Sequence, residues 1–333
     1  MPLLGSRTDG DRFASMVLLM GNTGAGKSYF VNKLKEGSVV EGDSLYSCTA
    51  RCQIIQATIG RTHIAICDCP GFNDTTRSDA EILNEISKIL SSQYLLKKKL
   101  RLRGILYLRD ITRKRMEGSD VRAFELFKKL VGVDSFPHVV FVTTMWGGLN
   151  EQEMARALKN EMELRDDFWQ EMIQNGSYMT RFQGNKASAE GIVSQLIGEA
   201  NPVILRIQRE LVDNGCELAD TAVGSSLLPV VEERLGHSKS KIKRLNERLT
   251  GESNATIQSK VKLDIKKAQS EENQAQFEKD QLKEKVGLEM KDKIKTGGTW
   301  QDNVRVICSV VGVSITIVAS VILPAAGVGC NVM

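Results

Sequence analysis

Residues 21–28 read GNTGAGKS and have the complete G-x-x-x-x-G-K-S spacing of a phosphate-binding loop. Glycines in such a loop let successive backbone N–H groups turn inward around a β-phosphate. Lys27 is expected to reach the β- and γ-phosphate oxygens, and the Ser28 hydroxyl is expected to bind Mg²⁺. The spacing therefore predicts a site for a nucleoside di- or triphosphate with Mg²⁺. The residues expected to contact this nucleotide are Gly21, Asn22, Thr23, Gly24, Ala25, Gly26, Lys27, Ser28 and Tyr29.

The segments on either side of the loop have the composition that a phosphate-binding loop requires. Residues 16–20 form a short, continuous apolar run, which is typical of a buried parallel strand. Residues 28–34 then have helical spacing, and no helix breaker follows until Gly37. Strand, loop and helix occur in the required order, which favours a phosphate site over an accidental Gly-rich turn.

A second motif, D-x-P-G at residues 68–71, follows another apolar strand about 40 residues after the loop. Asp68 is expected to hold Mg²⁺ through water, and the Gly71 N–H is expected to bond the γ-phosphate. Hydrolysis to the diphosphate would remove that bond and release the segment that follows. The two motifs together predict a nucleotide switch, because a nucleotide kinase would not need this glycine.

Thr49 is the residue expected in the first switch, with its hydroxyl on Mg²⁺ and its N–H on the γ-phosphate. It lies in the segment 46–52, just before an expected strand, and Ser47 is the competing candidate. A loop residue with β propensity is the alternative interpretation of Thr49. The residues expected to act in catalysis are Lys27, Thr49 and Gly71, and those expected to bind the metal are Ser28, Thr49 and Asp68.

The segment 144–147, which follows an expected strand, is the expected base-binding box and departs from the guanine-specific pattern N/T-K-x-D. In that pattern the Asp accepts hydrogen bonds from guanine and the Lys stem packs over the ring. Here Met145 replaces the Lys and Gly147 replaces the Asp. Gly147 cannot accept those bonds, so discrimination between bases is weakened and guanine preference stays open. The residues expected at the base are Thr144, Met145, Arg181 and Phe182, the last two opening a loop at 181–189.

Phe72 occupies the position after D-x-P-G where Ras-like enzymes have a Gln that orients the attacking water. An apolar side chain there predicts slow intrinsic hydrolysis, or hydrolysis that a partner or a dimer supports. Arg51, Arg77 and Arg113 are candidates for an arginine that acts in trans, and nothing in the sequence selects among them. For each of them a surface role is the simpler interpretation.

Composition limits the class of protein. A chain of 333 residues is long enough for one ordinary domain with extensions. The net charge of +4 is small and no basic stripe contains interleaved aromatics, so no nucleic-acid partner is expected. Seven scattered cysteines indicate a reducing compartment rather than a disulfide scaffold. The pairs Cys48/Cys52 and Cys67/Cys69 lack the further ligands that a zinc site needs, and no secretory signal is expected.

We expect an N-terminal tail over residues 1–13 and an α/β domain over 14–225, because short apolar runs alternate there with amphipathic stretches. The short connection at residues 60–62 predicts an antiparallel hairpin. The expected strands are 17–20, 53–59, 64–67, 104–108, 139–143 and 178–182. The expected helices between them are 79–96, 120–131, 151–167 and 187–211.

Residues 226–298 have a different character, because charged residues dominate and aromatics nearly vanish. Leu235, Ile242, Leu245 and Leu249 follow a/d spacing for about two heptads, and the segment 251–254 then interrupts the pattern. The region is expected to form long solvated helices, as a helical hairpin with coiled-coil tendency. A polar helix packed on the globular domain is the alternative.

Residues 306–323 contain no charged side chain, and about 20 such residues span a bilayer core. Their aliphatic residues supply roughly −3 to −7 kcal/mol on the biological insertion scale, before the hydroxyl residues are subtracted. We therefore expect a transmembrane or membrane-associated segment over 304–326, with the preceding lysines on the cytosolic side. A buried β-rich or helical segment is the alternative.

The chain ends in CNVM, which fits the C-a-a-X pattern for prenylation of Cys330. The two membrane hypotheses conflict: if residues 306–323 cross a bilayer, Cys330 lies on the side away from the prenyl transferases. Tail insertion is preferred here to lipidation.

With the loop, the segment 47–52, the D-x-P-G motif, the segment 144–147 and Arg181–Phe182 in this order, the chain resembles the septin-like, immunity-associated GTPases of the GIMAP or avirulence-induced-gene type. It looks most like the fungal G-domain proteins of that branch, over about residues 14–225. Related sequences commonly read T-K-W-D where this one reads TMWG. The resemblance implies a Ras-like G domain with a six-stranded, mostly parallel sheet that binds GTP or GDP with Mg²⁺. It also implies dimerisation through that domain, C-terminal helices and membrane anchors.

The leading hypothesis is a Mg²⁺-dependent guanine-nucleotide switch with slow or partner-assisted GTP hydrolysis, a cytosolic G domain and a membrane-anchored C-terminus. One alternative is a scaffold that binds nucleotide for assembly and hydrolyses little. The other alternative is an NTPase of relaxed specificity, which the altered base-binding box suggests because it lacks the guanine-specific residues.

Overall fold

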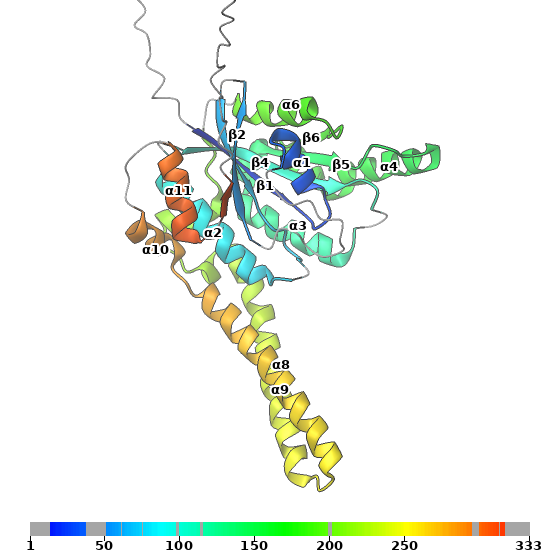
Figure 1. The fold of residues 1–333 in the computed structure, drawn as a ribbon, viewed down its shortest axis with the longest axis vertical. Helices are drawn as coiled ribbons and strands as arrows, with labels where there is room; N and C mark the ends of the chain where they lie inside the picture. The colour runs from blue at the N-terminus through cyan, green and yellow to red at the C-terminus, as the bar shows by residue number, and fades with distance from the viewer. Residues whose placement is uncertain are drawn as a thin grey trace, which may run out of the picture.

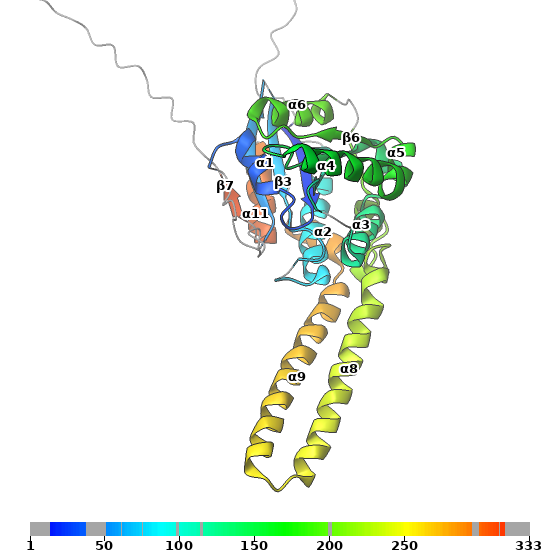
Figure 2. The same cartoon turned by 90° about the vertical axis from the view of Figure 1, so that its right-hand side faces the viewer.

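The computed structural model describes residues 14–37, 51–60, 62–74, 76–97, 100–113, 116–198, 202–294, 300–312 and 314–316. One sheet lies between two layers of helices, and a long pair of helices projects from the body of the molecule (Figures 1 and 2). The described strands are β1 (Ala14–Gly21), β2 (Gln53–Ile59), β3 (Thr62–Asp68), β4 (Leu100–Asp110), β5 (Val139–Thr144), β6 (Tyr178–Arg181) and β7 (Ser314–Thr316). The described α-helices are α1 (Lys27–Leu34), α2 (Asp79–Leu95), α3 (Gly118–Val131), α4 (Glu151–Glu163), α5 (Gln170–Gln174), α6 (Lys186–Ile197), α7 (Arg206–Gln208), α8 (Gly224–Gly251), α9 (Ala255–Leu282), α10 (Val286–Lys293) and α11 (Trp300–Val311).

The strand order is β6-β5-β4-β1-β3-β2-β7, and only the β2–β3 pair is antiparallel. The prediction of a six-stranded, mostly parallel sheet is confirmed for β1 to β6. The predicted hairpin is confirmed too: β2 and β3 are joined at Gly60, whose φ of 58° is costly for most other residues. The seventh strand, β7, comes from the C-terminal region, where a buried β-rich or helical segment was the alternative to a membrane segment.

The central strand β1 shows why its residues are apolar without a break. Met16, Leu18 and Met20 are buried in the core beneath α2 and α3, while Val17 and Leu19 are buried beneath α1 and α6 on the opposite face. A strand covered by helices on both faces needs apolar side chains at every position. This places the phosphate-binding loop, which follows β1, at the carboxyl end of the middle of the sheet.

Two predicted helices differ from the observed ones. The helix expected over 151–167 changes to a π-turn at Leu164–Phe168, where the Trp169 N–H bonds the Leu164 carbonyl at 2.7 Å. The helix expected over 187–211 is wrong in its middle, because α6 ends at Ile197. Pro202 has no N–H to continue a helix, and Val203 instead donates to the Leu102 carbonyl of β4 at 2.9 Å.

Helices α8 and α9 lie antiparallel and form an arm that extends away from the body of the molecule that contains the sheet (Figure 2). Asn254 caps α9 by accepting from the N–H groups of Thr256 and Ile257, which sets the turn between the helices. Val261 and Ile265 are buried in the seam of the pair. The expected helical hairpin is therefore present, while coiled-coil packing stays a prediction.

The C-terminal region returns to the body of the molecule. Val304, Ile307 and Cys308 of α11 are buried, and α11 packs against α2. β7 then pairs with β2 at the sheet edge. Among the residues the structure describes, no helix has the length and apolarity needed to cross a membrane. The described part of the segment expected over 304–326 is a packed helix followed by a short strand, and a membrane role for this segment stays a prediction.

Candidate functional site

The phosphate-binding loop begins at Gly21, where β1 lies directly against β4. A Cβ at Gly21 would lie 2.2 Å from the Leu108 carbonyl oxygen, so the backbones approach as only glycine allows. Gly24 and Gly26 have φ angles of 80° and 81°, in the left-handed region that glycine adopts without strain. The loop therefore has the backbone conformation that turns N–H groups toward an anion.

Lys27 is the first residue of α1, and its side chain lies back over the loop. Its Nζ donates to the Gly21 carbonyl at 2.8 Å and to the Asn22 carbonyl at 3.2 Å. Burial lowers the pKa of Lys27 below its usual value, and the charges of Asp68 and Asp74 partly oppose that effect. The ammonium is thus held at the mouth of the loop by groups that an anionic phosphate would replace.

The D-x-P-G motif lies against the loop. Asp68 ends β3 beside Leu19 of β1 and is fully buried. A Cβ at Gly71 would lie 2.3 Å from the Gly21 carbonyl oxygen, so the two motifs touch through their backbones. The next residue, Phe72, has only 3% of its surface exposed and packs in the core, as an apolar residue should.

A buried polar network anchors the phosphate-binding loop from beneath, and it was not predicted from the sequence. Asn22 donates from Nδ2 to Asp120 of α3, and Asp120 also accepts from Arg109 at 2.9 Å. Tyr107 donates its hydroxyl to Asn22 Oδ1 at 3.3 Å. The side chains of Arg109 and Asp120 are only 5% and 6% exposed, so each charge depends on the other for its solvation. Charged residues at the end of an apolar strand were the available signal.

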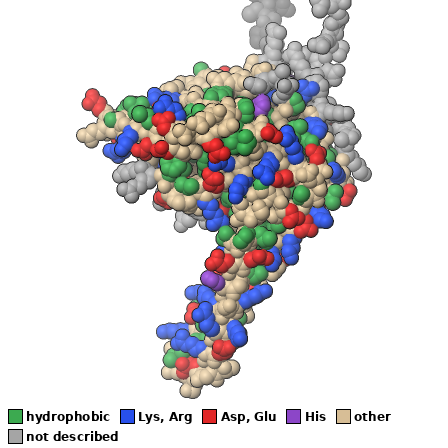
Figure 3. Space-filling model, turned by 180° about the vertical axis from the view of Figure 1, so that it is seen from behind, with side chains coloured by type: hydrophobic (Ala, Val, Ile, Leu, Met, Phe, Trp, Pro, Cys, Tyr) green, Lys and Arg blue, Asp and Glu red, His purple; other side chains and the backbone are tan. Residues whose placement is uncertain are grey.

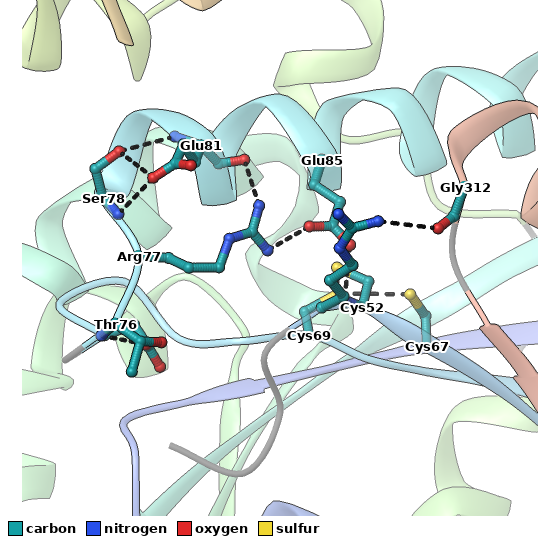
Figure 4. Close-up of polar contacts among 11 residues, drawn as sticks. Cys52, Cys67, Cys69, Thr76, Arg77, Ser78, Glu81, Glu85 and Gly312 are labelled. Carbon is teal, nitrogen blue, oxygen red and sulfur yellow. Dashed lines mark hydrogen bonds and ion pairs between the residues drawn. The ribbon is translucent and has the colours of Figure 1, made fainter. Parts of the chain in front are cut away.

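The three arginines that the sequence left undistinguished lie in different places. The Arg113 guanidinium is exposed and donates to the Thr23 carbonyl of the loop at 2.7 Å. Arg77 forms an ion pair with Glu85 of α2 (Figure 4). Arg51 donates to the Gly312 carbonyl at 3.5 Å. Arg113 is therefore the one of the three that contacts the phosphate-binding loop.

The base-binding box also borders the loop. The Thr144 hydroxyl donates to the Ala25 carbonyl at 2.9 Å. Met145 has a φ of 63° and is 43% exposed, and its Cε would lie 3.3 Å from a Cβ at Gly26. A thioether in this place offers an apolar surface on which a base can pack. Within the described ranges, no atom lies within 4 Å of a Cβ built at Gly147, so there is open space around the Cβ position of the missing Asp.

The residues expected at 181–182 have structural contacts. Arg181 lies over the Trp146 ring, 4.2 Å from its centroid, and forms a two-bond ion pair with Glu161. Phe182 is 2% exposed and packs against Phe30, with ring centroids 4.9 Å apart. Phe182 therefore supports α1 from inside the core, whereas Arg181 closes one side of the base-binding box.

The remaining predicted residues are less fully placed. Ser28 lies half-buried in the first turn of α1, next to Lys27, and the exposed Tyr29 donates to the Gly184 carbonyl at 3.0 Å. Thr49, its competitor Ser47, and Cys330 lie outside the described residues.

A nucleotide phosphate with Mg²⁺ fits the residues that are present, because left-handed glycines, a buried ammonium and a buried carboxylate meet at one edge of the sheet.

A phosphate-binding loop after the central parallel strand, with D-x-P-G on the neighbouring strand in contact with it, defines the class of P-loop G domains. A profile of the AIG1 family matches residues 15–196, which is more than half of the chain. The chain belongs to the AIG1 family of P-loop GTPases. No curated protein matches the sequence.

Solved structures of similar fold include Toc33 from Arabidopsis thaliana in complex with Mg²⁺ and GMPPNP. It is 17% identical with a TM-score of 0.43, and the match covers 56% of this chain and 84% of that one. Toc33 with GDP and Mg²⁺ is 18% identical with a TM-score of 0.44, and the match covers 59% of this chain and 88% of that one. Era in complex with MgGDPNP and ribosomal RNA is 18% identical with a TM-score of 0.40, and the match covers 58% of this chain and 60% of that one.

Proposed function

We propose that the chain is a Mg²⁺-dependent guanine-nucleotide switch that hydrolyses GTP slowly unless a second copy or a partner assists. The observation that supports this most is the contact between Gly71 and Gly21, because it joins the γ-phosphate sensor to the phosphate-binding loop. A phosphate bonded to the loop would also set the position of the Gly71 N–H. Loss of the γ-phosphate would then remove the bond to the Gly71 N–H and release the segment that follows Gly71.

The residues have separable roles in this proposal. Lys27 exchanges its bonds to the Gly21 and Asn22 carbonyls for bonds to phosphate oxygens. Ser28 and Asp68 hold Mg²⁺, with Thr49 as the third candidate from the sequence. The metal, when bound, neutralises charge on the phosphate oxygens. Met145 packs on the base.

Slow intrinsic hydrolysis follows from the burial of Phe72, which offers no polar group to orient water. Arg113 is the proposed aid to hydrolysis, because it is exposed and already bonded to the loop. A second copy that packs on this face would fix its guanidinium near the phosphates. The GTP hydrolysis rate per molecule should then rise with protein concentration, and Arg113→Ala should remove that rise. The control is Arg209→Ala, which breaks an exposed ion pair with Asp134 and should keep the rise. A rate that is independent of concentration in every variant would contradict assistance by a second copy.

The decisive experiment measures binding of GTP, GDP, ATP and ADP with Mg²⁺ to the full chain, with Lys27→Ala as the control. Selective binding of guanine nucleotides, lost in Lys27→Ala, supports the switch. Equal binding of ATP and GTP would favour the NTPase of relaxed specificity, which the open space at Gly147 makes the second candidate. Absence of binding would leave a scaffold.

Association with an anionic membrane surface is part of the proposal. Residues 236–270, the distal part of the arm, contain nine Lys or Arg and three Asp or Glu, a local excess that is larger than the +4 of the whole chain. Figure 3 shows Lys and Arg side chains along the visible face of the arm, with Asp and Glu side chains among them. Each basic residue near an anionic bilayer is worth about 1 kcal/mol. Sedimentation with vesicles containing phosphatidylserine, but not with pure phosphatidylcholine, is the expected result, and equal sedimentation would contradict it.

A further inference from the structure

Three cysteines form a cluster beside the switch motif that the nucleotide site does not use. The Cys52 Sγ lies 3.3 Å from the Cys69 Sγ, and the Cys67 Sγ lies 3.5 Å from the Cys69 Sγ (Figure 4). All three side chains are fully buried. Three thiols at van der Waals separation are more than packing requires, since alanine or valine would fill such a space without a reactive group.

The sheet topology makes one pair of this cluster suitable for a disulfide. In the antiparallel β2–β3 ladder Gln53 is opposite Asp68 and Ile54 is opposite Cys67, so the next step places Cys52 opposite Cys69. Directly opposite residues have Cβ atoms about 4.5–5.5 Å apart, close to the separation that a disulfide needs. Cys67 and Cys69 are two residues apart along one extended chain, where bridging would distort the backbone.

Both members of this pair border predicted switch residues. Cys69 is the second residue of D-x-P-G, between Asp68 and Gly71, and its N–H bonds the Leu19 carbonyl of β1 at 3.2 Å. Cys52 follows Thr49 by three residues in the sequence. A covalent bond between them would tie the chain that leaves the first switch to the chain that enters the second.

A surface cavity of about 420 Å³ offers a route toward the pair. Its lining includes Arg51, Arg77, Lys88 and Glu85. The Glu85 carboxylate accepts from the Cys52 N–H at 2.8 Å and pairs with Arg77, so the cavity wall contacts the backbone of Cys52 (Figure 4). The thiols themselves are fully buried, so a small oxidant reaches them only when the protein opens locally beside this cavity.

We propose that Cys52 and Cys69 form an oxidisable thiol pair whose disulfide locks the two switch segments together. With hydrogen peroxide as oxidant, one thiol releases its proton and its sulfur attacks a peroxide oxygen, so the O–O bond breaks, a sulfenic acid forms and the departing hydroxide takes up the proton as water. The second thiol releases its proton and its sulfur attacks the sulfenic sulfur, so the S–O bond breaks, the S–S bond forms and the second hydroxide takes up that proton as water. Two thiols thus lose two protons and two electrons to one peroxide. The effect on nucleotide exchange rests on the proposed function, whereas formation of the disulfide does not.

The test treats the reduced full chain with hydrogen peroxide, alkylates it under denaturing conditions and maps the tryptic peptides. Trypsin cleaves after Arg51, Arg61 and Arg77, so Cys52 lies on one peptide and Cys67 and Cys69 share the next. The expected product is peptide 52–61 linked to peptide 62–77. Cys67→Ala is the matched control, because it keeps the proposed pair at a similarly buried position and should still give the link. Cys52→Ala should give none.

Two outcomes overturn the thiol pair: no link between these peptides in the folded protein, or a link that disappears in Cys67→Ala. A formed disulfide should also raise the midpoint of thermal unfolding, and reduction with dithiothreitol should reverse the rise. If the chain binds guanine nucleotide, the oxidised form should release GDP about tenfold more slowly, since the crosslink restrains segments that move. If the oxidised form releases GDP at an unchanged rate, the disulfide does not lock the switch segments, although its formation is still supported. A linked protein that binds no nucleotide would instead refute the proposed function.

Discussion

Gly147 is a single residue that decides whether the base-binding box can recognise guanine. The site has open space where an Asp carboxylate would project, and Met145 already lies over the loop. The variant Gly147→Asp, alone and with Met145→Lys, should therefore raise the GTP-to-ATP affinity ratio by at least about tenfold, because it restores the missing hydrogen-bond acceptor. Competition binding measures the ratio. Gly148→Asp is a poor control because Gly148 has a φ of 77°, so Gly147→Ala is the matched one. An equal ratio in the Asp and Ala variants would mean that other groups already read the base.

Asp120 carries the buried network that holds the loop. Replacement by Asn keeps the shape but removes the charge that neutralises Arg109, whose side chain is 5% exposed. Asp120→Asn should lower the free energy of unfolding by about 3–5 kcal/mol. Urea denaturation measures the loss. The control Asp166→Asn breaks a solvent-exposed pair with Arg165 and should leave the free energy of unfolding almost unchanged, because solvent screens that pair. Similar losses in both variants would show that the network is not a structural anchor.

The sequence could predict the parts of the site that are contiguous. Residues 21–28 define their own loop because glycines, lysine and serine act at fixed short spacing, and D-x-P-G does the same. The contacts from Asn22 to Asp120 and from Cys52 to Cys69 join residues that are far apart in the chain, so they depend on strand order and register. Neither property is encoded in a local pattern, and both contacts were missed.

At the scale of elements, strands were easier to predict than helix ends. β5 is buried at all six positions, so its apolar run marks its existence, and the strand ends at Thr144, one residue beyond the expected limit. The helix expected over 187–211 failed because apolar spacing continues across Pro202, although the chain there bonds to β4 instead. The seam of the arm was visible as apolar residues every three or four positions, and Val261 and Ile265 are buried in it.

The arm offers a test within one helix. Ile265 of α9, a helix that packs along α8, is 9% exposed, whereas Leu263 of the same helix is 54% exposed. Ile265→Ala should destabilise the arm by about 2–4 kcal/mol, because it leaves a cavity in the seam. Leu263→Ala should change stability by less than about 0.5 kcal/mol. Hydrogen exchange of α8 and α9 amides reports both. If the two variants have equal effects, the helices do not depend on this seam.

At the scale of the whole molecule, the C-terminal region connects the sheet edge to the face opposite the phosphate-binding helix. Helix α11 buries Ile307 against the core, and Ser309 on the same helix is exposed. The apolar residues that favoured a membrane segment thus have a second environment within the protein, where burial of one large side chain contributes about 1.5–3 kcal/mol. Docking on α2 and insertion into a bilayer would compete for the same side chains.

That competition gives a measurable expectation. Ile307→Ala should lower the free energy of unfolding by about 2–5 kcal/mol, since it removes a buried aliphatic side chain. Ser309→Ala should leave it within about 0.5 kcal/mol. Because Ile307→Ala also weakens docking, it should increase the fraction of the chain that sediments with anionic vesicles, whereas Ser309→Ala should not. Loss of stability without any gain in sedimentation would mean that the described part of the tail serves only to close the fold. Unchanged stability would mean that α11 does not depend on this contact.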